Sequence, residues 1–221
     1  MTDGTQITRE FWDRLYDGFV TPGEGQPNRY LVTEVENITP GTALDLGCAQ
    51  GADAIWLARH GWQVTAVDVS DIALDRARQN AAEAGVANQI RFEQHDLGTD
   101  FPTGSFDLVS AQFLHSPIAA PGERERILRQ AAEAVAPGGH LLVVSHQSVP
   151  AWHPGMPDGL TDQPLDLTVP SPEENIAALH LAEGAWVTIR AETAAIELTS
   201  PSGEPGIRED HVLHYVRKAN P

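Results

Sequence analysis

The chain has 221 residues, of which 41% are apolar, and its formal net charge is −17. This length favours one domain with a full hydrophobic core, and no apolar run approaches the roughly 20 residues that cross a membrane. With only 14 Lys and Arg residues, the chain lacks the basic patches that bind nucleic acid, which favours a neutral or cationic small molecule as partner. The polar start of the chain and the single Cys48 predict a cytoplasmic protein without an internal disulfide.

The N-terminal part carries an amphipathic pattern that predicts a helix over 6–19. Its apolar row consists of residues four apart in the sequence, Ile7, Phe11, Leu15 and Phe19. Trp12 and Tyr16 form a second row, which we expect to close over the functional site because the first row already supplies core contacts. A break with Pro and Gly follows at 21–26, and residues 28–37 are expected to form a second helix.

Strands and helices alternate through the central part of the chain. Short apolar runs predict strands at 43–46, 63–67, 89–93, 106–112 and 140–146. Segments rich in helix-forming residues predict helices at 52–60, 71–84 and 122–136. Pro137-Gly138-Gly139 is expected to be a tight turn into the fifth strand. This alternation predicts an α/β fold with a doubly wound, mostly parallel sheet, helices on both faces, and a ligand site beyond the carboxyl ends of the strands.

The C-terminal part changes character. Residues 147–170 contain five prolines and are expected to form a variable loop over the site. A short helix at 172–181 and two antiparallel strands at 185–198 and 211–217, joined by 200–210, would complete the fold. We therefore expect a single domain over 1–221, divided into N-terminal helices over the site at 1–40, a cofactor-binding core at 41–146, the loop at 147–170, and a C-terminal helix and strand pair at 171–221.

A glycine-containing turn separates the first predicted strand from the first helix of the core. Gly47 and Gly51 occupy places where a chain leaving a strand turns sharply and approaches a ligand closely. Asp68 ends the next strand about 20 residues further on, where a βαβ unit offers a carboxylate to a ribose diol. Ala49 stands where the dinucleotide fingerprint G-x-G-x-x-G has its middle glycine, so the turn departs from a pyrophosphate site.

Five features in the right order resemble the class I S-adenosylmethionine-dependent methyltransferases from about residue 41 to 144. They are the glycine motif Asp45–Gly51, the acid Asp68, the pair Asp96-Leu97, the segment 106–109 and Pro137-Gly138-Gly139. The segment Phe11-Trp12-Asp13-x-x-Tyr16 and the compact tail are similar to the small bacterial tellurite-resistance and thiopurine-type branch. The resemblance implies a seven-stranded Rossmann-like sheet, S-adenosyl-L-methionine as cofactor, and methyl transfer to a small-molecule acceptor.

The family pattern implies roles for the residues of the turn. Gly47, Cys48, Ala49 and Gly51 would run beneath the methionine part of the cofactor, and Cys48 would fill space there rather than act as a nucleophile. Asp45 would hold the turn or meet the ammonium group of the cofactor. The methyl group of Ala49 is harmless in this turn if the φ angle is negative and unfavourable if it is positive.

The resemblance also implies contacts to the rest of the cofactor. Asp68 would accept hydrogen bonds from both ribose hydroxyls, and Asp96 would accept one from the adenine amino group. The remaining cofactor positions implied are Val69 and Leu97 on the two sides of the adenine, Gln112 and Phe113 beside the methionine tail and the methyl group, and Trp12 and Tyr16 as a cover.

In-line methyl displacement requires positioning of the acceptor and, for a hydroxyl acceptor, removal of a proton. His115 and His146 follow adjacent parallel strands and are expected to converge, and they are the catalytic candidates together with Tyr16. No spacing typical of metal ligands is present, so we expect no metal. The acceptor atom remains open among oxygen, nitrogen, sulfur and a heavier chalcogen, and a thiolate or selenolate would need no base.

Two other classes of function remain open. Ala49 and the absence of an assured base are compatible with a protein that binds S-adenosylmethionine with little or no catalysis, as a sensor or partner subunit. A nicotinamide-dependent oxidoreductase would share the fold, but the missing glycine pattern weighs against it. We expect a monomer or a homodimer that acts on a small molecule and has neither a nucleic-acid nor a membrane partner.

Overall fold

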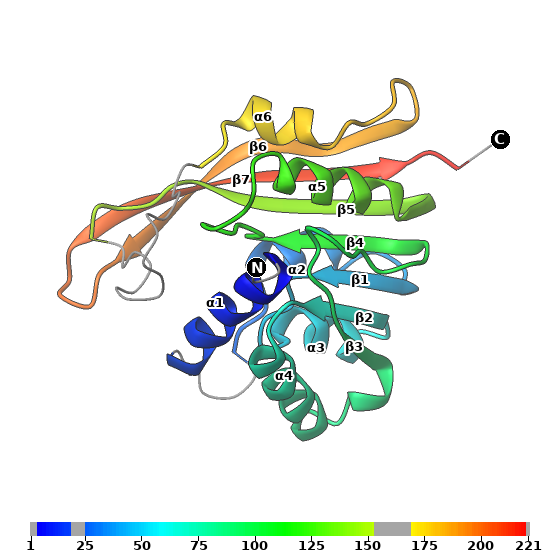
Figure 1. The fold of residues 1–221 in the computed structure, drawn as a ribbon. Helices are drawn as coiled ribbons and strands as arrows, with labels where there is room; N and C mark the ends of the chain where they lie inside the picture. Colours follow the sequence, from blue (N-terminus) through cyan, green and yellow to red (C-terminus); the bar gives the residue numbers. More distant parts are fainter. Residues whose placement is uncertain (1–3, 19–24, 153–168, 220–221) are drawn as a thin grey trace.

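The computed structural model describes residues 4–18, 25–152 and 169–219. These residues form one seven-stranded sheet in the order β3-β2-β1-β4-β5-β7-β6 (Figure 1). The strands are β1 (Thr42–Leu46), β2 (Gln63–Asp68), β3 (Ile90–Gln94), β4 (Phe106–Gln112), β5 (Val135–Ser148), β6 (Trp186–Thr199) and β7 (Pro205–Arg217). Strands β1 to β5 pair in parallel, whereas β7 runs antiparallel to both β5 and β6. The predicted fold class is confirmed.

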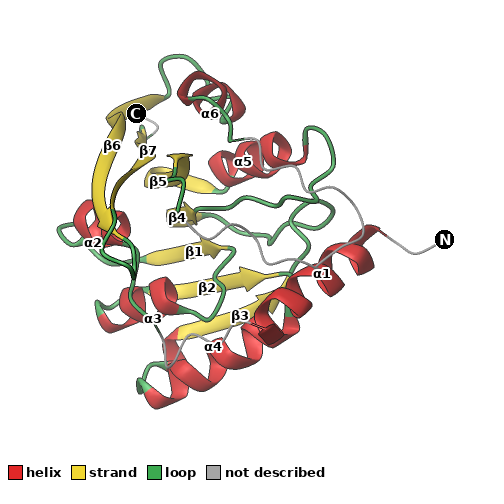
Figure 2. Ribbon diagram, turned by 90° about the vertical axis from the view of Figure 1, so that its left-hand side faces the viewer, coloured by secondary structure: helices red, strands yellow, loops and turns green. Residues whose placement is uncertain are grey.

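Helices cover both faces of the sheet (Figure 2). They are α1 (Gly4–Gly18), α2 (Arg29–Val35), α3 (Ala52–Arg59), α4 (Asp71–Glu83), α5 (Glu123–Glu133) and α6 (Pro172–Ala178), with a 3-10 turn at Ala87–Gln89. Buried side chains of α2, α3 and α4 belong to one hydrophobic cluster, and those of α5 and α6 to the other. Helix α1 lies at the end of the sheet toward which the arrowheads of β2 and β3 point.

Strand β1 shows how the sequence builds these two clusters. Ala43 packs with the helices of the first cluster, whereas Leu44 and Leu46 pack with α5 in the second. All three side chains are fully buried. A parallel strand with helices on both faces needs apolar side chains in both directions, which is why this segment is an almost continuous apolar run.

The segment Pro137-Gly138-Gly139 corrects one prediction, because it lies inside β5 and is not a separate turn. The register between β4 and β5 shifts here, and Gly138 has a φ angle of 85°. A Cβ atom on Gly139 would lie 2.9 Å from the carbonyl oxygen of Phe106. The two glycines therefore permit a bulge with close backbone approach within one long strand.

The C-terminal hairpin also differs from expectation at its tip. Strand β7 begins at Pro205, which pairs with Thr199, so residues 205–210 belong to the strand and not to the connection. Charged side chains in this stretch interrupt the alternation of apolar residues from which the strand was predicted. Other predicted boundaries differ from the observed ones by a few residues.

Some predictions fall on residues outside the described ranges. Phe19 of the first helix lies there, together with residues 153–168 of the predicted loop. Gln147 and Ser148, expected at the start of that loop, belong to β5. Among the described residues, no helix is long and apolar enough to cross a membrane.

Candidate functional site

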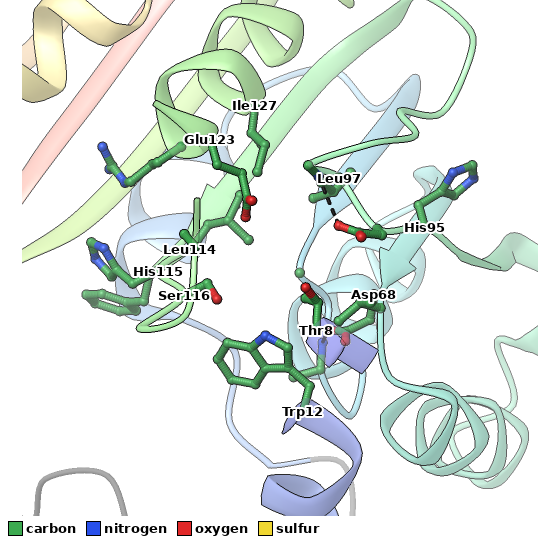
Figure 3. A pocket seen from close by; sticks show the side chains of 18 of the residues that line it. Thr8, Trp12, Asp68, His95, Leu97, Leu114, His115, Ser116, Glu123 and Ile127 are labelled. Atoms are coloured by element: carbon green, nitrogen blue, oxygen red, sulfur yellow. Dashed lines mark hydrogen bonds between the residues drawn. The ribbon is translucent and has the colours of Figure 1, made fainter. Parts of the chain in front are cut away.

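A cavity of about 240 Å³ lies beyond the carboxyl ends of β1, β2 and β4. Figure 3 shows Trp12 from α1, Asp68, Leu97, His115 and Glu123 around this space. Eleven predicted site residues line it, namely Trp12, Tyr16, Gly47, Ala49, Asp68, Val69, Asp96, Leu97, Gln112, Phe113 and His115. Four predicted residues do not line it, namely Asp45, Cys48, Gly51 and His146. The parallel sheet brings most of the predicted set to one edge, as such sheets do.

The glycine turn has an unusual backbone. Gly47 and Gly51 have φ angles of 72° and 88°, and the intervening Ala49 has a φ angle of 48°. A side chain on Gly47 would be strained by this φ angle, and its Cβ would lie 2.7 Å from Leu114 Cδ1, so that leucine would have to move. Ala49 thus occupies the left-handed region that costs an L-residue free energy, which is the unfavourable case foreseen from the sequence.

Asp68 organises this turn from the end of β2. Its Oδ2 accepts a hydrogen bond of 3.0 Å from the Ala49 N–H, and its Oδ1 accepts one of 3.0 Å from the Ser70 N–H. Burial raises the pKa of Asp68, and the backbone hydrogen bonds oppose that effect by stabilising the charged form. A carboxylate oxygen can accept more than one hydrogen bond, so Asp68 retains capacity for donors in the cavity.

Asp45 and Cys48 lie behind the turn. Asp45 is buried, and its Oδ2 has no hydrogen-bond partner among the described residues. Burial, with the nearby carboxylates of Asp53 and Asp68, raises the pKa of Asp45 well above its usual value. Burial likewise raises the pKa of the Cys48 thiol, which favours the neutral, unreactive form.

Asp96 and Leu97 follow β3, which pairs with β2, the strand that ends at Asp68. Asp96 Oδ1 accepts a hydrogen bond of 3.1 Å from the Gly98 N–H, which fixes the carboxylate at the wall of the cavity. Leu97 is buried and presents an apolar surface there. His95, which also lines the cavity, contacts the carboxylates of Asp100 at 2.7 Å and Glu93 at 3.1 Å.

Helix α1 contributes aromatic side chains to the cavity. The ring centroids of Trp12 and Tyr16 lie 6.2 Å apart. Burial, followed by the charges of Asp68 and Cys48, raises the pKa of Tyr16, so its phenol is held neutral. Asp13 Oδ1 accepts a hydrogen bond of 2.6 Å from Ser70 Oγ and thereby attaches α1 to the start of α4.

The chain leaving β4 brings Phe113 and His115 to the cavity. Phe113 stacks on His146 with ring centroids 4.1 Å apart, and the His115 and His146 centroids are separated by 6.0 Å. The predicted convergence of the two histidines is therefore observed, although only His115 lines the cavity. Burial, then the charge of Arg124, lowers the pKa of His115 to about 3, so this imidazole is neutral at physiological pH.

His146 is held from the neighbouring strand β7. Its Nδ1 lies 3.0 Å from Oδ1 of the fully buried Asp210, and Arg208 pairs with the other oxygen of that carboxylate at 2.9 Å. The Arg208 guanidinium also lies over the Phe113 ring, 5.3 Å from its centroid. An Asp–His pair of this kind fixes the orientation of the imidazole.

Several lining residues were absent from the sequence-based set, namely Thr8, His95, Gly98, Leu114, Ser116, Ala119, Glu123, Arg124 and Ile127. The start of α5 is the main omission, because its apolar residues indicated only a core-facing helix. The position of this helix after β4, at the ligand-binding edge of the sheet, was the available signal. No group of three or more potential metal ligands occurs within the described ranges.

Comparison with known proteins agrees with this geometry. Residues 43–139 match the family model described as "Methyltransferase domain". Ribosomal RNA small subunit methyltransferase C of Alcanivorax borkumensis is 31% identical over 116 residues, which cover 50% of this chain and 34% of the relative. The 27-O-demethylrifamycin SV methyltransferase of Amycolatopsis mediterranei is 34% identical over 112 residues, which cover 49% and 39% of the two chains. The matched region thus spans less than half the length of these relatives.

Solved structures resemble the chain over more of its length. The structure from the study "Conversion of a Disulfide Bond into a Thioacetal Group during Echinomycin Biosynthesis" has a TM-score of 0.70 and 21% identity, covering 97% of this chain and 93% of its own. TehB from Haemophilus influenzae has a TM-score of 0.65 and 19% identity, covering 86% and 62%. At these identities the similarity shows the fold alone.

The sheet is that of a Rossmann-like methyltransferase fold, and the match over 43–139 is to a methyltransferase domain family that uses S-adenosylmethionine. The finer assignment to the tellurite-resistance and thiopurine-type branch is not confirmed, because TehB is one structural neighbour among several, and others are named as different methyltransferases.

Proposed function

We propose that this chain transfers the methyl group of S-adenosylmethionine to a small-molecule acceptor. The observation that carries the proposal is a single cavity that holds two sets of residues. One set consists of positions that the family uses for the cofactor, from the glycine turn to Asp96. The other set consists of side chains at the end of β4 and the start of α5, such as His115 and Arg124, which have no counterpart in the cofactor motifs.

The residues around the turn fit the cofactor. Asp68 presents a carboxylate already oriented by two backbone N–H groups, which suits a pair of ribose hydroxyls. Asp96 and Leu97 would meet the adenine, and Gly47 leaves its backbone uncovered by any Cβ beneath the methionine part. The neutral Tyr16 would donate a hydrogen bond, and the Trp12 ring would face the sulfonium charge favourably.

The cofactor supplies an electrophilic methyl group and a neutral leaving group, and the protein supplies position, exclusion of water and, where needed, a proton acceptor. His115 lines the cavity, but its lowered pKa makes it a weak base that would form a hydrogen bond with the acceptor and not remove its proton. His146, oriented by Asp210, is the stronger candidate base, although Phe113 lies between its ring face and the cavity. These properties favour an acceptor that arrives deprotonated or needs little base assistance.

The shape and charge of the chain support a small molecule over RNA, even though one relative is named as a ribosomal RNA methyltransferase. The net charge of −17 opposes contact with a phosphate backbone. The candidate site is also a cavity between α1 and α5, whereas an enzyme acting on RNA requires a basic surface beside its site.

Calorimetric titration tests the cofactor site. We expect the parent chain to bind S-adenosylmethionine and S-adenosylhomocysteine in the micromolar range and to bind NAD much more weakly. Asp68→Ala should weaken binding by at least about tenfold, because a hydrogen bond to a charged group contributes about 1.5–3 kcal/mol. The control Asp75→Ala removes an exposed acid on α4 that pairs with Arg78 and should bind like the parent.

The same titration, together with an assay for release of S-adenosylhomocysteine, separates the alternatives. Preferential binding of NAD would support an oxidoreductase and overturn the proposal. Tight cofactor binding without release of S-adenosylhomocysteine across a panel of phenols, amines and thiols would support the sensor or partner-subunit function.

A further inference from the structure

The acceptor end of the cavity contains a guanidinium group that has no carboxylate partner among the residues that the structure describes. Arg124 lies at the start of α5 and donates a hydrogen bond of 2.8 Å from Nη2 to Ser145 Oγ on β5. Ser145 in turn lies 3.4 Å from Asn175 Oδ1 on α6, which fixes the orientation of the hydroxyl. Among the described residues, Arg124 forms no ion pair, and its Nε is buried without a hydrogen-bond partner.

Two histidines add further unpartnered nitrogen atoms near this guanidinium. His115 Nε2 and His211 Nδ1 are both buried without a partner in the described ranges. His211 lies directly across from Ser145 in the β5–β7 pairing, and it is 2% exposed. The charge of Arg124 contributes to lowering the pKa of both imidazoles, which places both within its electrostatic reach.

The nearby acidic groups do not neutralise Arg124. Glu123 also lines the cavity, but its Oε2 accepts a hydrogen bond of 3.1 Å from the Ala120 N–H. Glu125 raises and burial lowers the pKa of Arg124, and burial is the larger effect. Partial burial removes water from the guanidinium, and the single hydroxyl of Ser145 does not replace all of that hydration. A bound anion would replace the rest.

We propose that Arg124 binds a carboxylate group of the methyl acceptor, so that the acceptor is a small organic acid. Arg124 offers a planar fork of donors suited to a carboxylate, and Ser145 fixes that fork from behind. The neighbouring neutral His115 would donate a further hydrogen bond from its unpartnered nitrogen. The proposal rests on the proposed function, which places the acceptor at this end of the cavity.

The local site reverses the expectation drawn from overall charge. The net charge of −17 favours a neutral or cationic ligand at long range, but in solutions near physiological salt this field is screened beyond about 8–10 Å. A desolvated guanidinium within the cavity acts at contact distance, where screening is weak. An acidic chain can therefore bind an organic acid when one partly buried cation in the cavity matches the charge of that acid.

Matched pairs of ligands test the proposal without requiring turnover. We would titrate 4-hydroxybenzoate, 4-aminobenzoate and 4-mercaptobenzoate against their uncharged amides, with and without S-adenosylhomocysteine. We expect at least one acid to bind ten times more tightly than its amide. Arg124→Met should reduce this preference to less than threefold, and Arg124→Lys, which keeps the charge but not the fork, should give an intermediate value. Arg129→Met, an exposed position on the same helix, is the control and should retain the full preference.

Three results would overturn the proposal. The first is equal binding of acids and amides by the parent chain, and the second is an acid preference that persists in Arg124→Met. The third is a loss of S-adenosylhomocysteine affinity in Arg124→Met that accounts for the whole loss of acid binding, with no change in acid preference when the cofactor product is absent, because Arg124 would then hold the carboxylate of the cofactor. Failure of S-adenosylhomocysteine to bind the parent would overturn the proposed function alone, since the acid preference is also measured without cofactor.

Discussion

Ala49 is the residue at which sequence and backbone conflict most directly. Its φ angle of 48° lies in the left-handed region, where an L-residue other than glycine is strained by about 1–3 kcal/mol. Its N–H nonetheless donates to Asp68, so the strained conformation also orients the carboxylate proposed to bind the ribose. The strained turn therefore lowers the stability of the chain but holds a functional group in position.

Two substitutions of Ala49 should change the free energy of unfolding in opposite directions. Ala49→Gly should raise the free energy of unfolding by up to about 1 kcal/mol, because relief of strain exceeds the added entropy of the unfolded chain. Ala49→Val should lower it by at least about 1 kcal/mol, because a branched side chain fits this region poorly. Urea unfolding monitored by tryptophan fluorescence would measure both.

A control at a helical position makes the Ala49 result specific. Ala82→Gly on α4 should destabilise the chain by about 0.5–1 kcal/mol, since glycine weakens a right-handed helix. Destabilisation by Ala49→Gly of the same size would contradict the strain argument.

At the scale of elements, α1 is attached to α4 through polar contacts. Asp13 accepts from Ser70 Oγ, and Ser70 also caps α4 through a bond from the Ala73 N–H. Arg76 Nη1 donates a second hydrogen bond to the Tyr16 carbonyl oxygen. One serine thus serves both the start of a core helix and the attachment of the helix that covers the cavity, so loss of the Asp13 contact should make local opening of α1 easier.

Removal of this contact should loosen α1 selectively. Asp13→Ala should accelerate amide hydrogen exchange of residues 4–18 by about tenfold, because loss of a charged hydrogen bond makes local opening easier by about 1.5 kcal/mol. Exchange in β1 should be unchanged, and S-adenosylhomocysteine should bind several times more weakly. Glu10→Ala, which removes an exposed contact to Gln6 on the same helix, is the control. Unchanged exchange over 4–18 would show that apolar packing alone holds α1.

At the scale of the whole molecule, charge distinguishes the two kinds of acceptor suggested by the relatives. A chain with 31 Asp and Glu residues against 14 Lys and Arg residues repels polyanions over most of its surface. The proposed anion site is a single, partly buried cation, which can hold a carboxylate but offers no groove to a phosphate backbone.

The chain should therefore bind no structured RNA. We expect no retention of a ribosomal RNA hairpin in filter binding with about 10 μM protein at 50 mM salt, conditions that favour electrostatic binding. Addition of S-adenosylhomocysteine should not change this result. Micromolar, salt-sensitive binding would contradict the small-molecule proposal and support an RNA acceptor instead.

The sequence alone determined the fold and most of the cavity wall. Apolar runs alternating with helical segments specified a parallel sheet because buried parallel strands need apolar residues on both faces. The carboxyl ends of parallel strands meet at one edge, so motif residues far apart in sequence, from Gly47 to Phe113, were placed together by topology alone. The resemblance of the same motifs to a known methyltransferase family implied the cofactor class.

Only the tertiary structure decided which side chains share the rest of the cavity. The positive φ angle of Ala49 and the bulge around Gly138 depend on how neighbouring strands approach, which local pattern does not encode. Asp210 reaches His146 across 64 residues of sequence, and Ser145 reaches Arg124 across 21 residues, from one element to another. Such polar contacts carry no periodic signal, because each depends on one pair of residues brought together by the packing of the whole sheet.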